Sequence, residues 1–333
     1  MQNLPISTWL FNMNSTDTVA VASRSFSKNT TLIDALRAEY SNILLNETGK
    51  TLEGKDLITF LGSADKAIIG IEEISAELLD QLPRLKVISK YGVGINNLDT
   101  VALKSKGVKL GFTPGVNKQS VAELALTLTL LSLRKIHQNH IEITEGIWSQ
   151  EKGAELFGKT VGLLGFGNIG QKFASFLQPF NCRIIFFDEK VFSDQELSSA
   201  CKDLGLKREL IQQDALAAVL SQADVLSIHL PLLEETENII SSKELSLLKS
   251  SVSIINTARG GIVNEPALHT FLSNNPDAFA AFDVFAEEPA LENPLFELPN
   301  FFGTSHRSSL THEGINAMGL AAIAGLDDNK ILT

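Results

Sequence analysis

Six short apolar runs alternate with amphipathic segments between about residues 160 and 305, and this alternation constrains the fold more than any other feature. In chain order the runs are TVGLLG, RIIFFD, ADVLSIHL, SVSIINT, AFAAFDVF and FFGTS. Near-continuous runs of Val, Ile, Leu and Phe are typical of parallel strands that helices cover on both faces. The sequence therefore predicts an α/β fold with a doubly wound parallel sheet in this part of the chain.

The first part of the chain repeats the same pattern more weakly. Strand candidates lie at Thr18–Ala22, Lys66–Ile69 and Lys86–Ser89. A length of 333 residues suits two domains better than one. We therefore expect a second, smaller α/β domain, with the turn-rich segment Thr113–Ser120 as the crossing between the domains.

Composition and charge exclude several classes of function. The formal net charge of −11 opposes unspecific binding to nucleic acid, which requires clustered Lys and Arg. The two cysteines, Cys182 and Cys201, lack the spacing of metal ligands and are too few for a disulfide framework, so we expect no metal and a reducing, cytoplasmic location. The N-terminus lacks the pattern of a signal peptide, and no apolar stretch reaches the roughly 20 residues that a bilayer requires, so we expect no membrane partner.

The longest apolar-rich stretch, Val121–Leu133, predicts a helix that is apolar around most of its circumference. Such a helix is either buried in the core or part of a dimer interface. Helical periodicity cannot separate these two interpretations, and both stay open at this point.

A glycine motif indicates a dinucleotide site. In GLLGFGNIGQKF the residues Gly165, Gly167 and Gly170 have G-x-G-x-x-G spacing directly after a predicted strand and at the start of a predicted helix, with Phe166, Asn168 and Ile169 between them. Such glycines permit a tight turn, the approach of a pyrophosphate, and close packing of helix on strand. Glycines also collect in turns for structural reasons alone, so the motif depends on its context.

The context is Asp188, which ends the next predicted strand 18 residues after Gly170. A carboxylate at this place can accept hydrogen bonds from the adenosine ribose, and it would repel the additional phosphate of NADP. The following residue is Glu189 and not an arginine, so the sequence predicts NAD as the cofactor. A solvated strand end is the structural alternative for Asp188.

Three further charged or titratable residues follow strand candidates of the same region. Arg259 lies in NTARGG, Glu288 in FDVFAEEP and His306 in GTSHRSSLT. In an open α/β sheet, ligands bind at the carboxyl ends of the strands. A guanidinium matches a carboxylate with two parallel hydrogen bonds, and an imidazole beside a carboxylate suits proton transfer. Each residue alone could be structural, as a buried ion pair, a turn residue or a surface histidine.

The sequence strongly resembles the D-isomer-specific 2-hydroxyacid dehydrogenase family, and more closely its phosphoglycerate-dehydrogenase-like members. The resemblance covers about residues 65–311, and the matching segments, in the order of the family, are YGVGINNLD, TPGVNKQSVAEL, GLLGFGNIG, HLPLLEET, INTARGGIVNE, DVFAEEP and TSH. It implies an NAD-dependent oxidoreductase in which Arg259 holds the substrate carboxylate and keto oxygen, His306 is the acid/base and Glu288 pairs with His306. The implied substrate is a D-2-hydroxy acid or 2-oxo acid, with phosphorylated acids such as 3-phosphoglycerate included.

The resemblance also implies an architecture and additional site residues. It implies a Rossmann-type NAD domain at residues 115–305, a flavodoxin-like substrate domain at residues 1–114 and 306–333, and a cleft between the two. The implied substrate-binding residues are Ile69, Gly70, Val93 and Gly94. The implied cofactor-lining residues are Pro231, Thr236, Thr257, Ala258 and Asp283.

Two observations leave alternatives open. Ser305 and Arg307 flank His306, where the family usually has Pro before the histidine and small residues after it, which unsettles the substrate range. Arg24 could be a second anion anchor or a solvated surface residue.

A homodimer is expected. An NAD-sensing binding protein, such as the corepressors that share this fold, is the alternative to an enzyme.

Overall fold

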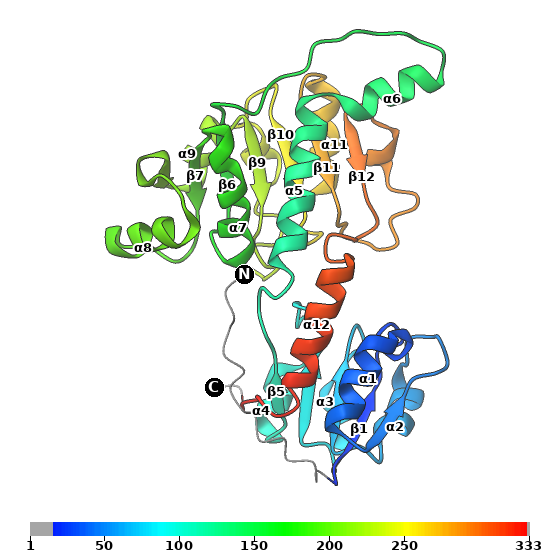
Figure 1. Cartoon of the computed structure of the whole chain (residues 1–333). Helices are drawn as coiled ribbons and strands as arrows, with labels where there is room; N and C mark the ends of the chain where they lie inside the picture. The colour runs from blue at the N-terminus through cyan, green and yellow to red at the C-terminus, as the bar shows by residue number, and fades with distance from the viewer. Residues whose placement is uncertain (1–15, 332–333) are drawn as a thin grey trace. The chain divides into compact units, whose positions relative to one another are not determined.

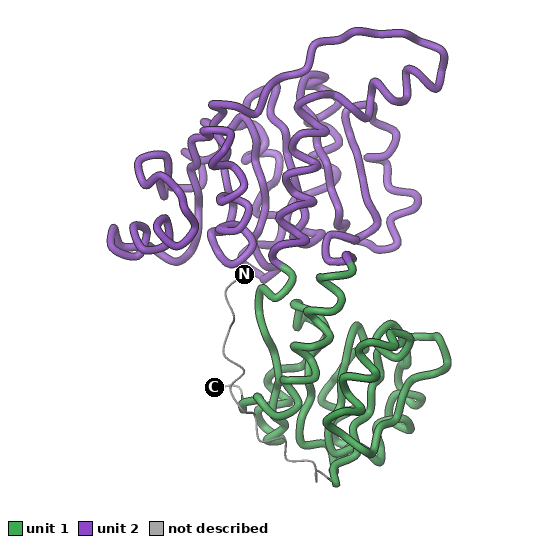
Figure 2. Tube along the Cα trace, in the orientation of Figure 1, with its two compact units in different colours: residues 1–117, 312–333 green, residues 118–311 purple. Residues whose placement is uncertain are grey.

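The computed structural model describes residues 16–331. The chain divides into two compact units, residues 118–311 and residues 1–117 with 312–333 (Figure 2). Both divisions fall a few residues further along the chain than we expected. We call residues 118–311 the large unit and the remainder the small unit, and describe each by itself.

The large unit is built on a seven-stranded sheet in which every strand pair is parallel (Figure 1). The strand order is β12-β11-β10-β9-β6-β7-β8, which contains the Rossmann order. The strands are β6 (Thr160–Leu164), β7 (Arg183–Phe187), β8 (Ile211–Gln213), β9 (Val225–Ile228), β10 (Ser253–Asn256), β11 (Phe279–Phe282) and β12 (Phe301–Gly303). All six apolar runs of the sequence form strands, so the predicted fold is confirmed.

Helices cover both faces of this sheet, because each face has its own apolar core. One core includes buried residues of α5 (Lys118–Leu133), α7 (Asn168–Leu177) and α8 (Asp194–Leu204). The other includes residues of α9 (Leu216–Gln222), α10 (Ser242–Leu245) and α11 (Glu265–Asn274). The short 3-10 helices η2, η3 and η4 occupy Gln178–Phe180, Arg208–Leu210 and Pro294–Glu297.

The apolar helix of the sequence analysis, α5, is a core helix. Val121, Ala125 and Leu128 are buried, and the helix packs against α7 and strands β10 and β11. Leu124, Leu126, Leu130 and Leu131 are partly buried against the same core. The interpretation as a core helix therefore holds for most of its surface.

The next helix, α6 (Ile136–Thr144), has no buried residue. Figure 1 shows α6 and the segment after it extending away from the sheet of the large unit. Large apolar side chains are exposed along this stretch, among them Ile136, Ile143, Ile147 and Trp148, and Trp148 is 81% exposed. We call residues 136–148 the arm.

The small unit has a five-stranded parallel sheet in the order β2-β1-β3-β4-β5, the order of flavodoxin-like folds. Its strands are β1 (Thr18–Val21), β2 (Asn42–Leu45), β3 (Lys66–Ile69), β4 (Val87–Lys90) and β5 (Lys109–Gly111). Its helices are η1 (Phe26–Lys28), α1 (Thr30–Glu39), α2 (Gly54–Leu61), α3 (Ala76–Asp80), α4 (Thr100–Ser105) and α12 (His312–Ala324). The smaller α/β fold expected from the sequence is thus confirmed.

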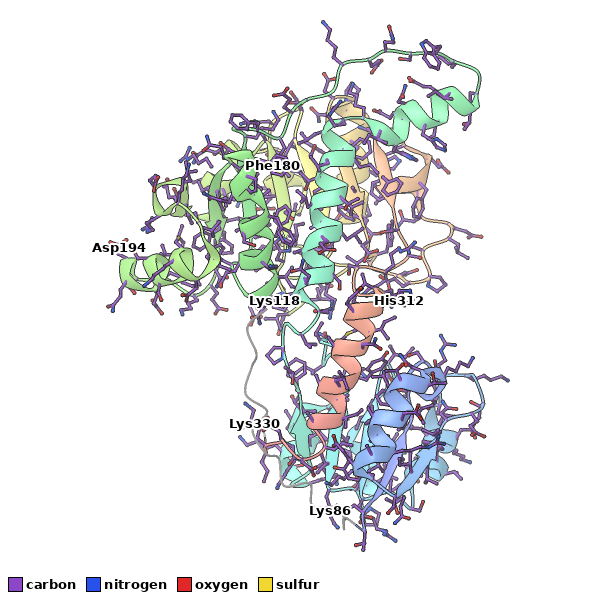
Figure 3. All side chains as sticks on the ribbon, in the orientation of Figure 1. Lys86, Lys118, Phe180, Asp194, His312 and Lys330 are labelled. Atoms are coloured by element: carbon purple, nitrogen blue, oxygen red, sulfur yellow. The ribbon has the colours of Figure 1, made fainter. Side chains whose placement is uncertain are left out.

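The end of the chain completes the small unit. Ala322, Ile323 and Leu326 belong to the same apolar core as Leu32 of α1. The Ser89 hydroxyl of β4 donates a hydrogen bond of 2.6 Å to the Ala322 carbonyl. Lys330, labelled in Figure 3, forms an antiparallel bridge with Leu110 of β5.

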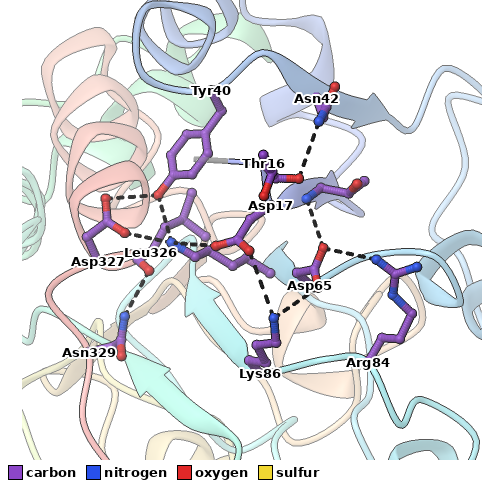
Figure 4. Close-up of polar contacts among 12 residues, drawn as sticks. Thr16, Asp17, Tyr40, Asn42, Asp65, Arg84, Lys86, Leu326, Asp327 and Asn329 are labelled. Atoms are coloured by element: carbon purple, nitrogen blue, oxygen red, sulfur yellow. Dashed lines mark hydrogen bonds and ion pairs between the residues drawn. The ribbon is translucent and has the colours of Figure 1, made fainter. Parts of the chain in front are cut away.

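A polar network ties this returning segment to the strands (Figure 4). Lys66 Nζ lies 2.6 Å from Asp327 Oδ1, and the Tyr40 hydroxyl donates to Asp327 Oδ2 at 3.0 Å. Asp65 accepts from Lys86 Nζ at 3.2 Å, and hydrogen bonds to its carboxylate lower the pKa of Asp65. Asp327 is mostly exposed, so its contact with Lys66 mainly fixes geometry and adds little stability.

Among the described residues, none of the helices combines the length and the apolar character that crossing a bilayer requires.

His229, which follows β9, is a histidine with little access to solvent. Its Nε2 atom lies 3.0 Å from the Ser227 hydroxyl, and its ring packs against Phe173. Part of the residue reaches the surface, but Nδ1 has no contact with solvent and no hydrogen-bond partner among the described residues. Burial lowers the pKa of His229 to about 3.

We predict that the free energy of unfolding falls as pH decreases from about 6.5 towards about 3. In this range His229 becomes protonated in the unfolded chain but stays neutral in the folded chain. The contribution of this one histidine approaches about 1.4 kcal/mol per pH unit. Denaturant unfolding at several pH values should give a shallower slope for His229→Gln than for the unchanged protein. Equal slopes would contradict the prediction, and His269→Gln on the outer part of α11 is the matched control.

Candidate active site

The three candidate catalytic residues follow three neighbouring strands. Arg259 comes after β10, Glu288 after β11 and His306 after β12, and these strands are adjacent in the sheet. Because the strands are parallel, their carboxyl ends lie at one edge. The sheet order therefore brings the loops that carry the three residues to the same edge of the large unit.

Glu288 and His306 are in direct contact. Glu288 Oε2 lies 2.7 Å from His306 Nδ1. The other carboxylate oxygen, Oε1, accepts a hydrogen bond of 3.0 Å from the Phe285 amide, so both oxygens are fixed. With Nδ1 held by the carboxylate, the Nε2 atom of the partly exposed imidazole is the one available to a ligand.

His306 has a backbone conformation that few non-glycine residues adopt, with φ of 49°. Asp283, which is fully buried, holds the segment around it. Its carbonyl accepts from the His306 amide at 2.8 Å, and its carboxylate accepts from the amides of Arg307 and Ser308 and from the Thr304 hydroxyl. The structure thus engages Asp283 with the histidine loop, and its expected contact with a cofactor stays a prediction.

The turn at Arg259 is shaped by Asn256, the last residue of β10. The Asn256 side chain accepts from the Ala258 amide at 3.0 Å and donates to the Arg259 carbonyl at 2.9 Å. Burial lowers the pKa of Arg259, and the charge of Glu288 opposes this shift. A guanidinium remains charged in proteins, so Arg259 is a fixed cation near the Glu288 carboxylate.

Gly260, the residue after Arg259, explains how closely the loops after β10 and β11 approach each other. A Cβ atom added to Gly260 would overlap the Phe285 carbonyl group. Only glycine therefore permits the backbone of the loop after β10, which carries Arg259 and is called the arginine loop, to contact the loop after β11. The loop after β11 carries Glu288 and is called the glutamate loop. This contact was not predicted, although the pair of glycines after Arg259 was visible in the sequence.

The glycine turn between β6 and α7 has the geometry that the motif predicts. Gly165 has φ of 95°, and a Cβ atom there would lie 2.8 Å from the His229 carbonyl oxygen. A Cβ atom on Gly170 would overlap the Gly165 carbonyl, whereas one on Gly167 would meet no atom within 4 Å. The turn is therefore tight at its first and third glycines and open at the second, at the N-terminus of α7.

Asp188 lies beside this turn. Its Oδ2 atom accepts a hydrogen bond of 2.6 Å from the Phe166 amide, and Oδ1 accepts from the Lys190 amide at 2.9 Å. The Phe166 ring points into the core, stacked on Phe186 at a centroid distance of 4.2 Å. Phe166 can therefore contact a ligand only through its main chain.

These residues fit a dinucleotide. The open space at Gly167 lies where the N-terminus of α7 attracts a pyrophosphate. The hydroxyl of Thr257, at the end of β10, is buried and lacks a hydrogen-bond partner among residues 16–331. Of the other predicted cofactor residues, Ala258 is buried in the arginine turn, and the Thr236 hydroxyl donates to the Pro231 carbonyl at 2.6 Å in the loop after β9.

The predicted substrate residues of the small unit differ from one another. Ile69 is fully buried, and the polar groups of Gly70 are engaged within the unit: its amide donates to Glu72, and its carbonyl accepts from Lys90 and Asn97. Val93 and Gly94 are half-buried, and within the described part of the chain no hydrogen bond from their amides is found. Val93 and Gly94 therefore have free donors for a substrate, whereas Gly70 does not.

Sequence reasoning missed several residues that support the site. They are Asn256 and Glu265 in the large unit, and Glu72, Lys90 and Asn97 in the small unit. Asn256 and Lys90 end strands, Glu265 starts a helix, and Glu72 and Asn97 lie in the loops after β3 and β4. These positions were the available signal. Most of their partners are main-chain groups, and the separations run from 2 residues for Glu72 and Gly70 to 28 residues for Glu265 and Asn293. None of these pairings follows from a motif.

Comparisons with known proteins agree with this geometry. The family model "D-isomer specific 2-hydroxyacid dehydrogenase, NAD binding domain" matches residues 126–308. Hydroxypyruvate reductase of Thermotoga maritima is 33% identical over 301 residues, which cover 87% of this chain and 94% of that protein. D-3-phosphoglycerate dehydrogenase of Methanocaldococcus jannaschii is 34% identical over 275 residues, covering 82% of this chain but 50% of that protein.

A solved structure shows the same fold with its cofactor. The NAD-dependent formate dehydrogenase of Staphylococcus aureus, in complex with NAD, has a TM-score of 0.76 and 26% sequence identity, and the match covers 95% of this chain and 99% of that one. The chain spans about half the length of the phosphoglycerate dehydrogenases that it matches. It belongs to the D-isomer-specific 2-hydroxyacid dehydrogenase family and is an NAD-dependent enzyme of that family.

Proposed function

We propose that the protein interconverts a small 2-oxo acid and the corresponding D-2-hydroxy acid, with Arg259, Glu288 and His306 as its catalytic residues. One observation carries this proposal: the 2.7 Å contact between Glu288 and His306 lies on the same sheet edge as the half-buried Arg259 cation. An acid/base pair and a guanidinium are the groups that this reaction requires.

Each residue has one task in the reducing direction. NADH, when bound, would provide the hydride that the carbonyl carbon accepts. Arg259 holds the carboxylate and the keto oxygen of the substrate, and it stabilises negative charge that develops on that oxygen. Protonated His306 donates its Nε2 proton to the same oxygen, while Glu288 fixes the orientation of the ring and stabilises its charged form. In oxidation, neutral His306 accepts the proton.

The cofactor and substrate contacts extend this proposal. Residues 165–170 and Thr257 would hold NAD, with Asp188 beside the adenosine ribose and Pro231, Thr236, Ala258 and Asp283 lining the site. The free amides of Val93 and Gly94 would bind the substrate carboxylate. Ile69 and Gly70 would support that loop by packing, since Gly70 has no free polar group.

For the substrate we propose an acid of the size of hydroxypyruvate, with 3-phosphoglycerate as the phosphorylated candidate. The names of the relatives support both. The unpaired thiols of Cys182 and Cys201 support a reducing, cytoplasmic location.

Purified protein with NADH should reduce at least one acid in a panel of phosphorylated and unphosphorylated 2-oxo acids. Arg259→Lys should lower kcat/KM on that acid by roughly 10- to 150-fold, because lysine loses one charge-assisted hydrogen bond of the bidentate pair. Initial rates of NADH consumption measure both effects, and Arg183→Lys on the surface is the control. Tight NADH binding without turnover on any acid would refute the enzyme and support the sensing protein.

Reduction and oxidation should have different pH optima, because His306 must carry a proton in the first and lack it in the second. The optimum for oxidation should lie at the higher pH. The measurement is the rate in each direction between about pH 5 and about pH 10, an interval that includes the range in which imidazole changes charge. Superimposable profiles would remove His306 from the proposed role.

We further propose that the arm docks on a second copy of the chain to form a homodimer. The arm has no buried residue in α6, and five of its large apolar side chains are exposed: Ile136, Ile141, Ile143, Ile147 and Trp148. Contiguous exposed apolar side chains mark interaction sites, and homodimer interfaces are the more apolar class. The partly buried leucines of α5 lie directly before the arm in the chain.

Replacing Ile143 and Trp148 by Asp should convert the dimer to a monomer, because two buried charges without partners oppose association. Light scattering coupled to size exclusion gives the mass, and circular dichroism verifies the fold. The control is Val101→Asp, which changes an exposed apolar residue of α4. A monomeric unchanged protein, or a double variant that remains dimeric, would exclude the arm as the interface.

A further inference from the structure

We infer that Glu265 is a positioning residue that holds the loop of Glu288 and thereby keeps Glu288 in contact with His306. The inference rests on the proposed roles of Glu288 and His306. Glu265 is the first residue of α11 and is 23 positions away from Glu288 in the sequence. No sequence motif connects the two residues.

Glu265 binds the glutamate loop at two points. Its Oε1 atom accepts a hydrogen bond of 2.7 Å from the Ala286 amide. Its Oε2 atom accepts one of 2.6 Å from the Asn293 side chain. Hydrogen bonds to an ionised carboxylate are stronger than those between neutral groups. Both oxygens of Glu265 are thus committed to the segment that carries Glu288.

The positions of these two contacts decide their effect. Ala286 lies two residues before Glu288, and Asn293 lies five residues after it. Before this stretch, the buried ring of Phe285 packs against Phe296 at a centroid distance of 5.3 Å. Beyond Phe285, residues Glu287, Leu291 and Glu292 are exposed, and the other contacts of the stretch are those of the Glu288 carboxylate and the packing of Ala290 on the core. Glu265 therefore holds the loop on both sides of the catalytic carboxylate.

The helix cap does not require this glutamate. Asn264 is the residue that caps α11, through a hydrogen bond of 2.9 Å from the Ala267 amide to its side chain. The Glu265 carboxylate is turned towards the loop instead. Its hydrogen bonds to Ala286 and Asn293 therefore hold the loop of Glu288 and are not part of the helix cap.

Glu265 also belongs to the loop that begins with Arg259. Five residues lie between Arg259 and Glu265 in the sequence, and one of them, Gly260, contacts the Phe285 backbone. One segment, residues 259–265, thus carries the substrate cation at one end and holds the acid at the other. This links the position of Arg259 to that of Glu288.

The partners of Glu265 permit a variant that reverses the direction of one hydrogen bond. In Glu265→Gln the new amide nitrogen would face the Asn293 amide nitrogen, so two donors would meet and the contact would be lost. Asn293 cannot rotate to correct this, because its Oδ1 atom accepts from the Leu295 amide at 3.0 Å. Adding Asn293→Asp restores a donor facing an acceptor and leaves the Leu295 contact intact.

The experiment compares four variants of the whole enzyme: Glu265→Gln, Glu265→Gln with Asn293→Asp, Glu287→Gln and Glu288→Gln. Glu287→Gln removes the same charge from the same loop, at an exposed side chain that makes no hydrogen bond within the described residues. We measure kcat, KM for both substrates, the pH profile of kcat and the thermal midpoint of unfolding.

Glu265→Gln should lower kcat by roughly 10- to 100-fold, because small displacements of a catalytic group are costly. KM for NADH should stay unchanged, and the pH profile should shift in the same direction as that of Glu288→Gln. The double variant should recover most of kcat and the original profile, and Glu287→Gln should resemble the unchanged enzyme.

Two results would overturn the inference. One is a Glu265→Gln enzyme with unaltered kcat and pH profile, while Glu288→Gln is impaired. The other is a loss of kcat that follows only the thermal midpoint and is not rescued by the double variant. Unimpaired Glu288→Gln would instead refute the proposed function, so the two failures can be told apart.

Discussion

The contact between the backbones of Gly260 and Phe285 is the constraint on which the site of the large unit depends. It brings the loop after β10 against the loop after β11, and so places the Arg259 cation near the carboxylate that binds His306. A side chain at position 260 would separate the two loops. The parallel order of β10, β11 and β12 makes this approach possible, because it delivers all three loops to one edge.

Hydrogen bonds to main-chain groups then fix the segments that carry Arg259 and His306 and the carboxylate of Glu288. Asn256 shapes the arginine turn, Asp283 holds the histidine segment, and the Phe285 amide binds the glutamate. Because these supporting groups come from strand ends that are themselves buried, the site stands on a rigid frame. The left-handed backbone at His306 persists for the same reason, since the groups of Asp283 leave that segment few alternatives.

The sequence predicted every strand of the sheet interiors and the edge strand β12, but missed the three other edge strands. Central strands such as β9 and β10 are continuous apolar runs, buried along their whole length. The missed strands β2, β5 and β8 lie at sheet edges, have three or four residues, and alternate in exposure or contain polar residues. At such places the pairing with a neighbouring strand decides the structure, and local sequence carries little of that information.

The same contrast applies to the site. Arg259, Glu288, His306 and the glycines could be proposed from the sequence, because the proposed chemistry requires those residue types at strand ends. Gly70 was predicted as a substrate contact, but its amide and carbonyl are engaged by Glu72 and Lys90, and only the folded chain reveals this. Glu265 was missed for the same reason, since its partners lie 21 and 28 residues away.

The return of the chain end to the small unit sets an order for folding during synthesis. Residues 16–117 leave the ribosome before the large unit, yet one face of their sheet lacks Ala322, Ile323 and Leu326 until residues 312–326 have been made. The large unit, which is continuous in sequence, can complete its core before that. The segment 16–117 therefore becomes fully packed only after the large unit has been made, and its unfinished face is a surface that a chaperone could bind on the nascent chain.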